Sequence, residues 1–419
     1  MTKEVEVKID NEVNEKVDKA TKALNEFLKL DQEQIDYIVA KASVAALDQH
    51  GALAKMAIEE TRRGCFEDKA TKNLFTCEHV INHMRDLKTV GVVSDDPITG
   101  IRQVADPVGV ICALTPVTNP TSTAIFKSLI SLKTRNPIIF SFHPSAQNCS
   151  GEAARIVRDA AVAAGAPENC VQWIENGSKE KTDELMNHEN VSTILATGGN
   201  AMVRAAYSCG KPALGVGAGN VPAYIEASAN LDQAVNDIVL SKSFDNGMVC
   251  ASEQGVIIDE VIYKDAVEKF KKYGVYFVNK TEKKKLEKFM FGVSSPKENA
   301  QAVLNPNIVG QDASWIAKEA GFEVPERTVI LAVECDSVGV NEPITKEKLS
   351  PVLAVLKSKD SDEGIDLAKQ MVEFNGLGHS AAIHTKSKEL VEEFGEVVPA
   401  IRIIWNSPST FGGIGNIYN

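Results

Sequence analysis

The sequence lacks the features that would place the chain in a membrane or outside the cell. It has no run of about 18 uncharged apolar residues that could span a bilayer, and Met1–Asp10 has no apolar core of a signal peptide. It has no excess of basic residues either, because the formal net charge is −12. An acidic chain is a poor partner for nucleic acids or anionic membranes. We therefore expect a cytoplasmic protein with no nucleic-acid or membrane partner.

The eight cysteines include no C-x-x-C pair and no cluster with the spacing of a zinc site or a disulfide framework. We expect reduced thiols in a reducing compartment. His79 and His83 have the spacing of two metal ligands on one helix face, but no third ligand is placed to complete a site. No bound metal is predicted.

The chain does have length and periodic hydrophobicity. Its 419 residues exceed one ordinary core and predict two or three domains. Apolar residues recur at three- and four-residue steps through residues 11–83, which predicts amphipathic helices. Valine-rich segments flank a turn at 94–100, which predicts a hairpin over about 90–110. A projecting hairpin is a candidate contact between subunits.

Strands and helices alternate after this hairpin. Strands are predicted near 108–114, 137–142, 170–175 and 192–196, with helices at 121–133, 151–164, 181–186 and 200–208. Such alternation predicts an α/β fold with a parallel sheet covered on both faces. Ligands of these sheets bind beyond the carboxyl ends of the strands. We therefore expect a crevice lined by the loops 114–119, 142–145 and 197–200. A second alternating region runs from 223 to about 404.

Cys250 lies in a loop of small residues, 244–254, between a predicted helix and a predicted strand. A nucleophilic thiol needs access, a nearby main-chain amide and room for a substrate carbonyl, and such a loop offers them. An inert buried thiol is the alternative, because free cysteine is among the residues most often buried.

Three further segments could contact a ligand. Thr197–Asn200 carries two glycines where a strand leads into a helix, which suits an anion, although an ordinary tight turn would look the same. Residues 215–220 are glycine-rich but do not match G-x-G-x-x-G. Asn119 is either an uncharged donor beside the crevice or the N-cap of the helix that follows.

Five segments, in their order and spacing, resemble the aldehyde dehydrogenase superfamily. More closely, they are similar to its CoA-acylating branch, specifically the N-terminal half of bacterial bifunctional aldehyde-alcohol dehydrogenases. The segments are Asn119-Pro120-Thr121, Gly215–Asn220, Phe244–Gln254, Glu347–Pro351 and Gly376–His379.

This resemblance implies an aldehyde dehydrogenase-like domain organisation. It implies a Rossmann-type dinucleotide-binding domain over residues 1–220, which includes the hairpin, and an α/β catalytic thiol domain over 221–404. The remaining residues, 405–419, would form a returning tail that enters a strand from Gly412 and looks truncated.

The resemblance also implies roles for single residues. Cys250 would add to an aldehyde, and its main-chain N–H and the Asn119 amide would hold the alkoxide; a thioester would remain after hydride transfer to NAD. His379 matches a histidine kept close to the cofactor or CoA. The cofactor positions are Leu114, Thr115, Pro116 and Asn119 beside the nicotinamide, Gly199 near the diphosphate, Gly217 beneath the ring and Glu347 at the ribose.

One departure from the superfamily indicates the acyl acceptor. Hydrolytic members carry a glutamate at the head of the glycine-rich segment, whereas Leu214–Asn220 contains no acid. Without a base, water is a poor nucleophile and the thiol of CoA is a better one. We therefore expect acetyl-CoA and NADH to be interconverted with acetaldehyde, CoA and NAD, in the reducing direction during fermentation.

The sequence leaves several alternatives open. His143-Pro144-Ser145-Ala146 replaces the lysine-proline-serine-glutamate of the superfamily, so this segment does not discriminate NAD from NADP, and NAD is expected from the close relatives. A hydrolytic aldehyde dehydrogenase, or a mainly structural assembly module, are the other functions considered. A homo-oligomer is expected, with an alcohol dehydrogenase half that could be fused to it in the native chain.

Overall fold

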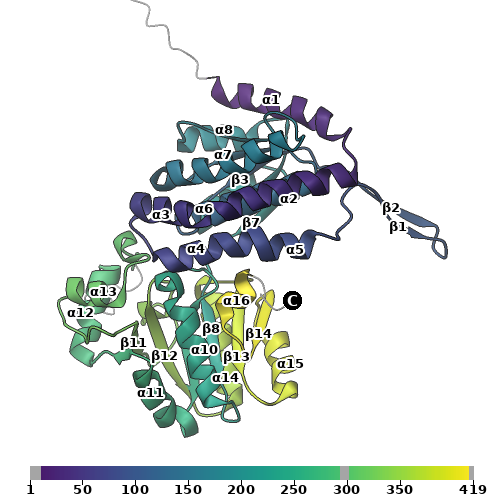
Figure 1. Ribbon diagram of the computed structural model, residues 1–419. Coiled ribbons are helices and arrows are strands. Elements are labelled where there is room, and N and C mark those ends of the chain that lie inside the picture. Colours follow the sequence, from purple (N-terminus) through teal and green to yellow (C-terminus); the bar gives the residue numbers. More distant parts are fainter. Residues whose placement is uncertain (1–10, 293–301, 415–419) are drawn as a thin grey trace, which may run out of the picture. The chain divides into compact units, whose positions relative to one another are not determined.

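The computed structural model describes residues 11–292 and 302–414 (Figure 1). These residues form two compact units. The first contains the residues up to Thr61 and Lys69–Val216, and the second contains Arg62–Asp68 and the described residues from Gly217 onward. The division falls between 216 and 217 rather than after 220, and the early segment 62–68 belongs to the second unit.

The first unit is built on a five-stranded parallel sheet. Its spatial order is β5-β4-β3-β6-β7. The strands are β3 (Val110–Leu114), β4 (Ile138–Ser141), β5 (Val171–Trp173), β6 (Val191–Thr197) and β7 (Ala213–Val216). Counted along the chain, this is the doubly wound order 3-2-1-4-5, in which the direction of winding reverses between β3 and β6. Ligand sites in such sheets lie at the carboxyl ends of those two strands.

Helices cover both faces of this sheet, as Figure 1 shows. Side chains of β3 alternate, since Ile111 and Ala113 enter one apolar core and Val110, Cys112 and Leu114 enter the other. The first core is closed by α2 (Gln32–Asp48), α3 (His50–Thr61), α6 (Pro120–Lys133) and α7 (Gln147–Ala163). The second core is closed by α1 (Glu12–Phe27), α8 (Lys179–Asn187) and α9 (Asn200–Ser208). The parallel sheet covered on both faces is confirmed.

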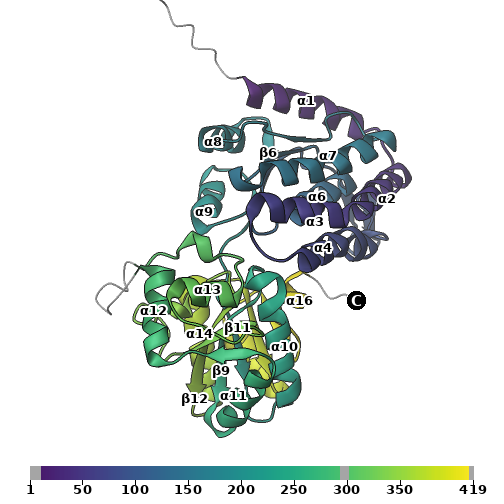
Figure 2. The same ribbon diagram turned by 60° about the vertical axis from the view of Figure 1, so that its left-hand side comes forward.

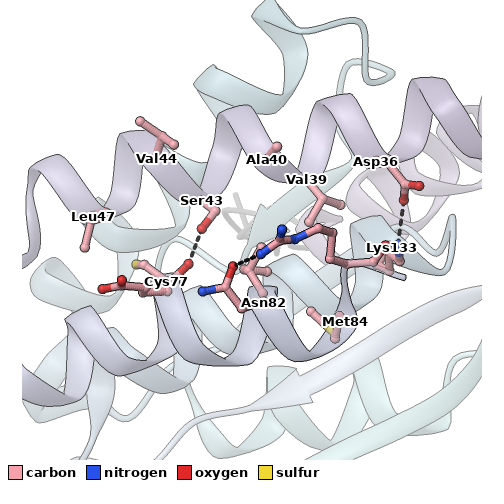
Figure 3. Close-up of a pocket in the computed structure, with 13 residues that line it drawn as sticks. Asp36, Val39, Ala40, Ser43, Val44, Leu47, Cys77, Asn82, Met84 and Lys133 are labelled. Atoms are coloured by element: carbon pink, nitrogen blue, oxygen red, sulfur yellow. Dashed lines mark hydrogen bonds and ion pairs between the residues drawn. The ribbon is translucent and has the colours of Figure 1, made fainter. Parts of the chain in front are cut away.

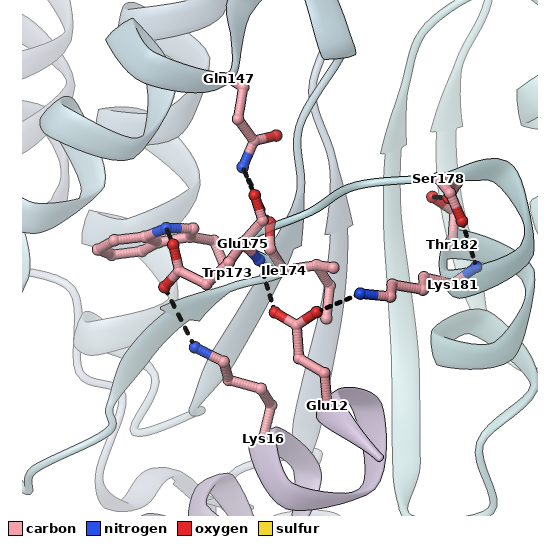
Figure 4. A network of polar contacts seen from close by, with 9 residues as sticks. All are labelled: Glu12, Lys16, Gln147, Trp173, Ile174, Glu175, Ser178, Lys181 and Thr182. Atoms are coloured by element: carbon pink, nitrogen blue, oxygen red, sulfur yellow. Dashed lines mark hydrogen bonds and ion pairs between the residues drawn. The ribbon is translucent and has the colours of Figure 1, made fainter. Parts of the chain in front are cut away.

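A polar network fastens α1 to the sheet (Figure 4). The carboxylate of Glu12 accepts hydrogen bonds from the main-chain nitrogen of Glu175 and from Lys181 Nζ, both at 2.6 Å. Lys16 and Trp173 both donate to the side chain of Glu175, at 3.5 and 3.2 Å. The Glu12–Lys181 pair is largely withdrawn from solvent, which makes it stronger than a fully exposed pair.

The predicted hairpin is confirmed. Strands β1 (Gly91–Asp96) and β2 (Ile101–Ala105) pair antiparallel. The Asp96 carboxylate accepts from the main-chain nitrogen of Ile98 and the hydroxyl of Thr99, and Gly100 takes a left-handed φ of 67°. Before the hairpin, α4 (Phe66–Phe75) continues through a wider helical turn (Thr76–Val80) into α5 (Ile81–Met84).

The second unit contains a seven-stranded parallel sheet in the order β10-β11-β12-β9-β8-β13-β14. Its strands are β8 (Val221–Ile225), β9 (Glu253–Asp259), β10 (Val275–Phe277), β11 (Ile330–Glu334), β12 (Val352–Ser358), β13 (Ser380–His384) and β14 (Arg402–Trp405). Figure 2 shows its helices in front of and behind the sheet. One core is closed by α10 (Leu231–Ser243) and α11 (Tyr263–Lys272), and the other by α12 (Lys280–Phe291), α13 (Ala313–Ala320), α14 (Ser361–Asn375) and α15 (Lys388–Val397).

The tail differs from its prediction. Gly412 lies in a short helix, α16 (Ser409–Ile414), rather than in a returning strand; residues 415–419 of the predicted strand lie outside the described residues. The first turn of α16 is held where Ser409 N donates to Glu253 Oε1 at 3.0 Å and Thr410 N donates to Ser241 Oγ at 3.1 Å. These bonds satisfy main-chain donors that a strand would have to pair elsewhere. Within residues 11–292 and 302–414, no helix combines the length and apolarity needed to cross a bilayer.

Candidate active site

Cys250 lies in a turn between α10 and β9, as predicted, and is partly exposed. The approach to it is strained, because Asp245, Asn246 and Gly247 have φ values of 48°, 53° and 67° in succession. Left-handed backbone costs roughly 1 kcal/mol or more at each non-glycine residue, so the surroundings must enforce it. Strain of this kind concentrates at functional sites. The geometry therefore favours a functional thiol over an inert one.

The contacts that hold residues 245–247 in this left-handed conformation come from the segment 62–68. Asp68 Oδ2 accepts from Asp245 N at 2.7 Å, and Asp245 Oδ1 accepts from Cys65 N at 2.9 Å. Gly64 also takes a left-handed φ of 77°, and a β-carbon there would lie 2.0 Å from Asp245 Oδ1. Asp245 itself is fully buried. The two carboxylates thus hold the thiol loop through charge-assisted hydrogen bonds to main-chain donors.

The sheet topology places the predicted residues of the second unit at the same end of four adjacent strands. The loops that carry Glu347, Cys250, Gly217 and His379 precede the adjacent strands β12, β9, β8 and β13. The strands are parallel, so their amino ends lie side by side. The crevice was predicted for the first sheet, at the carboxyl ends of its strands, whereas these four residues of the second unit lie at the amino ends of strands.

Gly219 is the point at which this group of loops meets. A β-carbon at Gly219 would lie 2.5 Å from the carbonyl oxygen of Cys250 and 3.0 Å from Cγ of His379. Its main-chain nitrogen donates to Glu347 Oε1 at 2.9 Å. Only a glycine allows the three loops to approach this closely.

Glu347 has an unusual environment for an acid. Burial raises the pKa of Glu347 to about 7, although the Gly219 hydrogen bond and the positive charges of Lys242 and Lys348 oppose the rise. Burial lowers the pKa of Lys242 to about 7 and lowers the pKa of Lys348 well below its usual value. Lys348 Nζ donates to the main-chain oxygens of Gln254, Ile344 and Lys346, which fixes the loop that carries Glu347.

His379 is buried and neutral at pH 7. Burial, with the positive charge of Arg402, lowers the pKa of His379 to about 4. Its Nδ1 lies 3.1 Å from the hydroxyl of Ser380, and that hydroxyl accepts from Arg402 Nε at 3.1 Å. Among the described residues, Nε2 of His379 is buried and has no hydrogen-bond partner. This nitrogen is available to a ligand.

In the first unit, Leu114 is the last residue of β3, and Thr115 and Pro116 follow it at the point where the sheet reverses its winding. Lys127, a buried residue of α6, donates to the main-chain oxygens of Leu114 and Leu195 at 2.7 and 2.8 Å. One ammonium therefore ties the ends of β3 and β6 together, and burial lowers the pKa of Lys127 to about 7. The buried hydroxyl of Thr115 has no partner in the structure that is described, which leaves a polar atom for a ligand.

Asn119 and Gly199 stand at helix starts in the same unit. Asn119 is the N-cap residue of α6, as the alternative prediction had it, but its side chain makes no capping hydrogen bond to this helix. Gly199 is the N-cap of α9, and a β-carbon there would meet nothing within 4 Å. The main-chain donors of the first turn of α9 suit an anionic group.

A separate cavity of the first unit contains none of these residues. It lies between α2 and the helical segment 77–85, and Figure 3 shows its apolar wall from Val39 to Leu47. Asp36 and Lys133 close one end with an ion pair of 2.5 Å. The described residues hold no group of three or more His, Cys, Asp or Glu arranged for a metal ion. The eight cysteines, all of which are described, form no disulfide.

The residues that support the site were not predicted from the sequence. Lys127 resembles an ordinary exposed lysine in sequence, and Asp68 stands 182 positions before Cys250. Spacing alone carries no signal for such contacts, because the partners are main-chain atoms of distant loops. An apolar helix interrupted by lysines on its inner face, as at 120–133, is the one pattern that could have indicated Lys127.

Comparison with known proteins identifies the family. The profile of the aldehyde dehydrogenase family matches residues 2–416. An aldehyde-alcohol dehydrogenase of Streptococcus pneumoniae serotype 4 is 69% identical over 411 residues, which are 98% of this chain and 46% of that protein. The bifunctional aldehyde-alcohol dehydrogenase of Escherichia coli K12 is 45% identical over 97% of this chain and 45% of its own length. The chain thus spans about half the length of these relatives.

Solved structures support the same assignment. The crystal structure of an acetylating aldehyde dehydrogenase from Geobacillus thermoglucosidasius has a TM-score of 0.93 and 44% identity, and the match covers 97% of this chain and 88% of that chain. The α/β fold expected from the resemblance is confirmed. The chain belongs to the aldehyde dehydrogenase family.

Proposed function

We propose that this chain is an NAD-dependent, CoA-acylating acetaldehyde dehydrogenase that interconverts acetaldehyde, CoA and NAD with acetyl-CoA and NADH. The observation that carries the proposal is the thiol of Cys250, which lies on a strained loop held by hydrogen bonds. The glycine-rich segment Leu214–Asn220 beside it contains no acid. The similarity to an aldehyde-alcohol dehydrogenase and to an acetylating enzyme supports it.

In this proposal Cys250 is the nucleophile. Its sulfur adds to the aldehyde carbonyl, and the oxygen becomes an alkoxide. The main-chain N–H of Cys250 and the Asn119 amide donate to that oxygen, and one such donor typically lowers a barrier by roughly 3 kcal/mol. Bound NAD supplies a hydride acceptor, so that a thioester remains on Cys250. The sulfur of CoA then attacks the thioester carbon, and the Cys250 thiolate leaves.

The absence of an acid in Leu214–Asn220 makes CoA the acceptor rather than water. Glu347 is a carboxylate on a loop that meets the loop of Cys250 at Gly219, and it accepts a hydrogen bond from Gly219 N. We assign it to the ribose hydroxyls of the cofactor. His379, neutral and with an unsatisfied Nε2, is assigned to CoA or the cofactor.

The residues of the first unit fit a dinucleotide. The reversal point of the sheet, the partnerless Thr115 hydroxyl beside Leu114 and Pro116, and the open space at Gly199 are features that a bound nucleotide would use. Gly217 would pass beneath the nicotinamide ring. We propose NAD rather than NADP, and acetyl-CoA reduction during fermentation in the cytoplasm as the physiological direction.

The hairpin β1–β2 is the proposed contact of a homo-oligomer. It exposes Ile98, Ile101 and Val104 at 94%, 58% and 56% of their surface. Apolar side chains on a projecting two-stranded ribbon favour burial against a partner. Because the relatives are about twice as long, we also propose that an alcohol dehydrogenase half accompanies this chain in the native protein.

Steady-state assays with and without CoA test the function. Wild type and Cys250→Ala are mixed with acetaldehyde and NAD, and NADH and acetyl-CoA are followed. The expected result is turnover that depends on CoA and disappears in the variant. Unchanged turnover in Cys250→Ala would refute the nucleophile.

Two other functions give different results in this assay. A hydrolytic enzyme would form NADH and acetate steadily without CoA, and the raised pKa of Glu347 is the observation in its favour, since an acid that titrates near pH 7 suits a general base. A mainly structural assembly module would form no acyl adduct on an intact Cys250 when mixed with acetyl-CoA.

A further inference from the structure

The Asn119 side chain is held in one orientation by Lys72 of α4. Lys72 Nζ donates to Asn119 Oδ1 at 2.6 Å, and Asn119 Nδ2 donates to Thr118 Oγ1 at 3.1 Å. An ammonium can only donate, so the atom that faces it must be the carboxamide oxygen, which fixes the orientation of the amide. Nδ2 carries two protons, and the bond to Thr118 uses one of them.

Lys72 lies on a buried polar face of α4 that serves this short loop. Lys69, Lys72 and Asn73 are 2%, 6% and 0% exposed. Lys69 Nζ donates to the main-chain oxygen of Thr118 at 3.2 Å, and Asn73 Oδ1 accepts from Thr121 Oγ1 at 2.8 Å. Burying an ammonium is costly unless its partners compensate. Lys72 donates to the carboxamide oxygen of Asn119, whereas the bond of Lys69 is to the main chain of Thr118.

We propose that Lys72 is a positioning residue for the reaction, acting through the Asn119 amide. Its hydrogen bond to Oδ1 keeps Nδ2 oriented as a donor, and its positive charge draws electron density toward the oxygen. Charge-assisted bonds of this kind are stronger than neutral ones, and they polarise the group to which they bind. The Nδ2–H that remains becomes a better donor to a developing alkoxide. This inference rests on the proposed role of Asn119.

Lys72→Met tests the inference because methionine has a similar length and no charge. We expect kcat for CoA-dependent acetaldehyde oxidation to fall about tenfold to a hundredfold, while KM for NAD changes less than about twofold, since removal of one oxyanion donor typically costs about 10²–10³ in kcat. Lys72→Gln, which keeps a neutral donor, should lie between wild type and Lys72→Met. Lys69→Met is the matched control from the same buried face.

A double-mutant cycle with Asn119→Ala separates positioning from general support of the loop. If Lys72 acts through the amide, Lys72→Met should change kcat less than about twofold in the Asn119→Ala background. Lys69→Met, by contrast, should have the same effect on kcat in both backgrounds. Independent, multiplying effects of Lys72→Met and Asn119→Ala would overturn the inference.

The same data distinguish failure of the inference from failure of the proposed function. An Asn119→Ala enzyme with full activity would remove Asn119 from the mechanism. An impaired Asn119→Ala enzyme beside a fully active Lys72→Met enzyme would refute only the role of Lys72. If thermal unfolding shows that Lys72→Met does not fold, Lys72→Gln replaces it in the double-mutant cycle. Independent effects of Lys72→Gln and Asn119→Ala on kcat would then refute the role of Lys72.

Discussion

Asp68 and Asp245 hold the loop of Cys250 through two hydrogen bonds to main-chain nitrogens. Asp68 Oδ2 accepts from Asp245 N at 2.7 Å, and Asp245 Oδ1 accepts from Cys65 N at 2.9 Å. Asp245 is one of the two non-glycine residues that adopt a left-handed backbone in the loop that leads to Cys250. Its conformation persists because the two carboxylates fix both its main chain and its side chain.

Asp68→Ala should therefore loosen the turn that carries Cys250. Loss of the acceptor leaves a main-chain donor without its partner, and we expect unfolding to become easier by about 1–3 kcal/mol. CoA-dependent turnover should fall, because the thiol is no longer held in place. Asp68→Asn keeps an oxygen acceptor and should be the milder variant. Urea unfolding and mass-spectrometric alkylation rates of Cys250 would check this, and equal effects of the two variants would contradict it.

Gly219→Ala should reduce turnover at least about a hundredfold. The added β-carbon would lie 2.5 Å from the Cys250 carbonyl oxygen and 3.0 Å from His379 Cγ, so the loops must separate. The prediction is checked by kcat and by the thermal midpoint, which should also decrease. An active and stable Gly219→Ala enzyme would show that these loops are not required to meet at Gly219.

Gly199→Ala, unlike Gly219→Ala, should leave the stability of the protein almost unchanged. Its φ is −63° and a β-carbon would meet nothing within 4 Å, so folding should change by less than about 0.5 kcal/mol. KM for NAD should rise roughly tenfold, because the cofactor diphosphate needs close approach to this turn. An unchanged KM would argue against the proposed diphosphate contact.

The stability of the protein should depend on pH through Glu347. Burial raises the pKa of Glu347 from its ordinary value of about 4.5 to about 7, so the folded state binds a proton more tightly than the unfolded state. This contribution is fully present below about pH 4.5 and is lost as pH rises through about 7. Glu347→Gln has no carboxyl group to titrate, so the variant does not lose this stability as the pH rises. The free energy of unfolding of Glu347→Gln relative to wild type should therefore increase between pH 5 and pH 8, by at most about 3 kcal/mol.

Urea midpoints of both proteins at pH 5, 6, 7 and 8 measure this difference. Lys242 and Lys348 are buried in both proteins, so the cost of burying them is common to the comparison. A difference that stays constant over this range would show that the carboxyl does not titrate there. The same variant should raise KM for NAD if Glu347 binds the ribose.

His379→Asn should separate the two halves of the reaction. If the unsatisfied Nε2 serves CoA, the first turnover of NADH from acetaldehyde and NAD should remain, while steady CoA-dependent turnover falls about tenfold or more. Because the pKa of His379 is about 4, the pH profile of wild type above pH 5 should show no step from this histidine. Stopped-flow absorbance of NADH resolves the two phases, and loss of the first phase would place His379 at the cofactor instead.

Charge on the hairpin β1–β2 should dissociate the proposed homo-oligomer. Ile101→Lys and Val104→Glu place charges at two positions of the ribbon whose apolar side chains are 58% and 56% exposed in the single chain. We expect lower mass by light scattering with little change in thermal stability, since these side chains contact little within the chain. An unchanged mass would exclude the hairpin as a contact.

The amino-acid sequence alone indicated much of the fold. Periodic apolar residues predicted the helix α9 at Asn200–Ser208 with its observed bounds, and four strands of the first sheet to within two residues at each end. The prediction succeeded because parallel strands buried on both faces are continuous apolar runs. Short or partly exposed strands such as β7 and β10 were not predicted. Gly412 was predicted to enter a strand, but it lies in the helix α16.

Local sequence determined which residues are chemically able to act. A thiol among small residues, a glycine-rich segment without an acid and an amide at a helix start are all properties of short segments, so Cys250, Gly217 and Asn119 could be proposed without coordinates. Only the tertiary structure decided how they are supported. Asp68, Lys127 and Lys72 act on main-chain or amide atoms far away in sequence. Hydrogen bonds depend on distance and direction in space, which the order of residues does not contain.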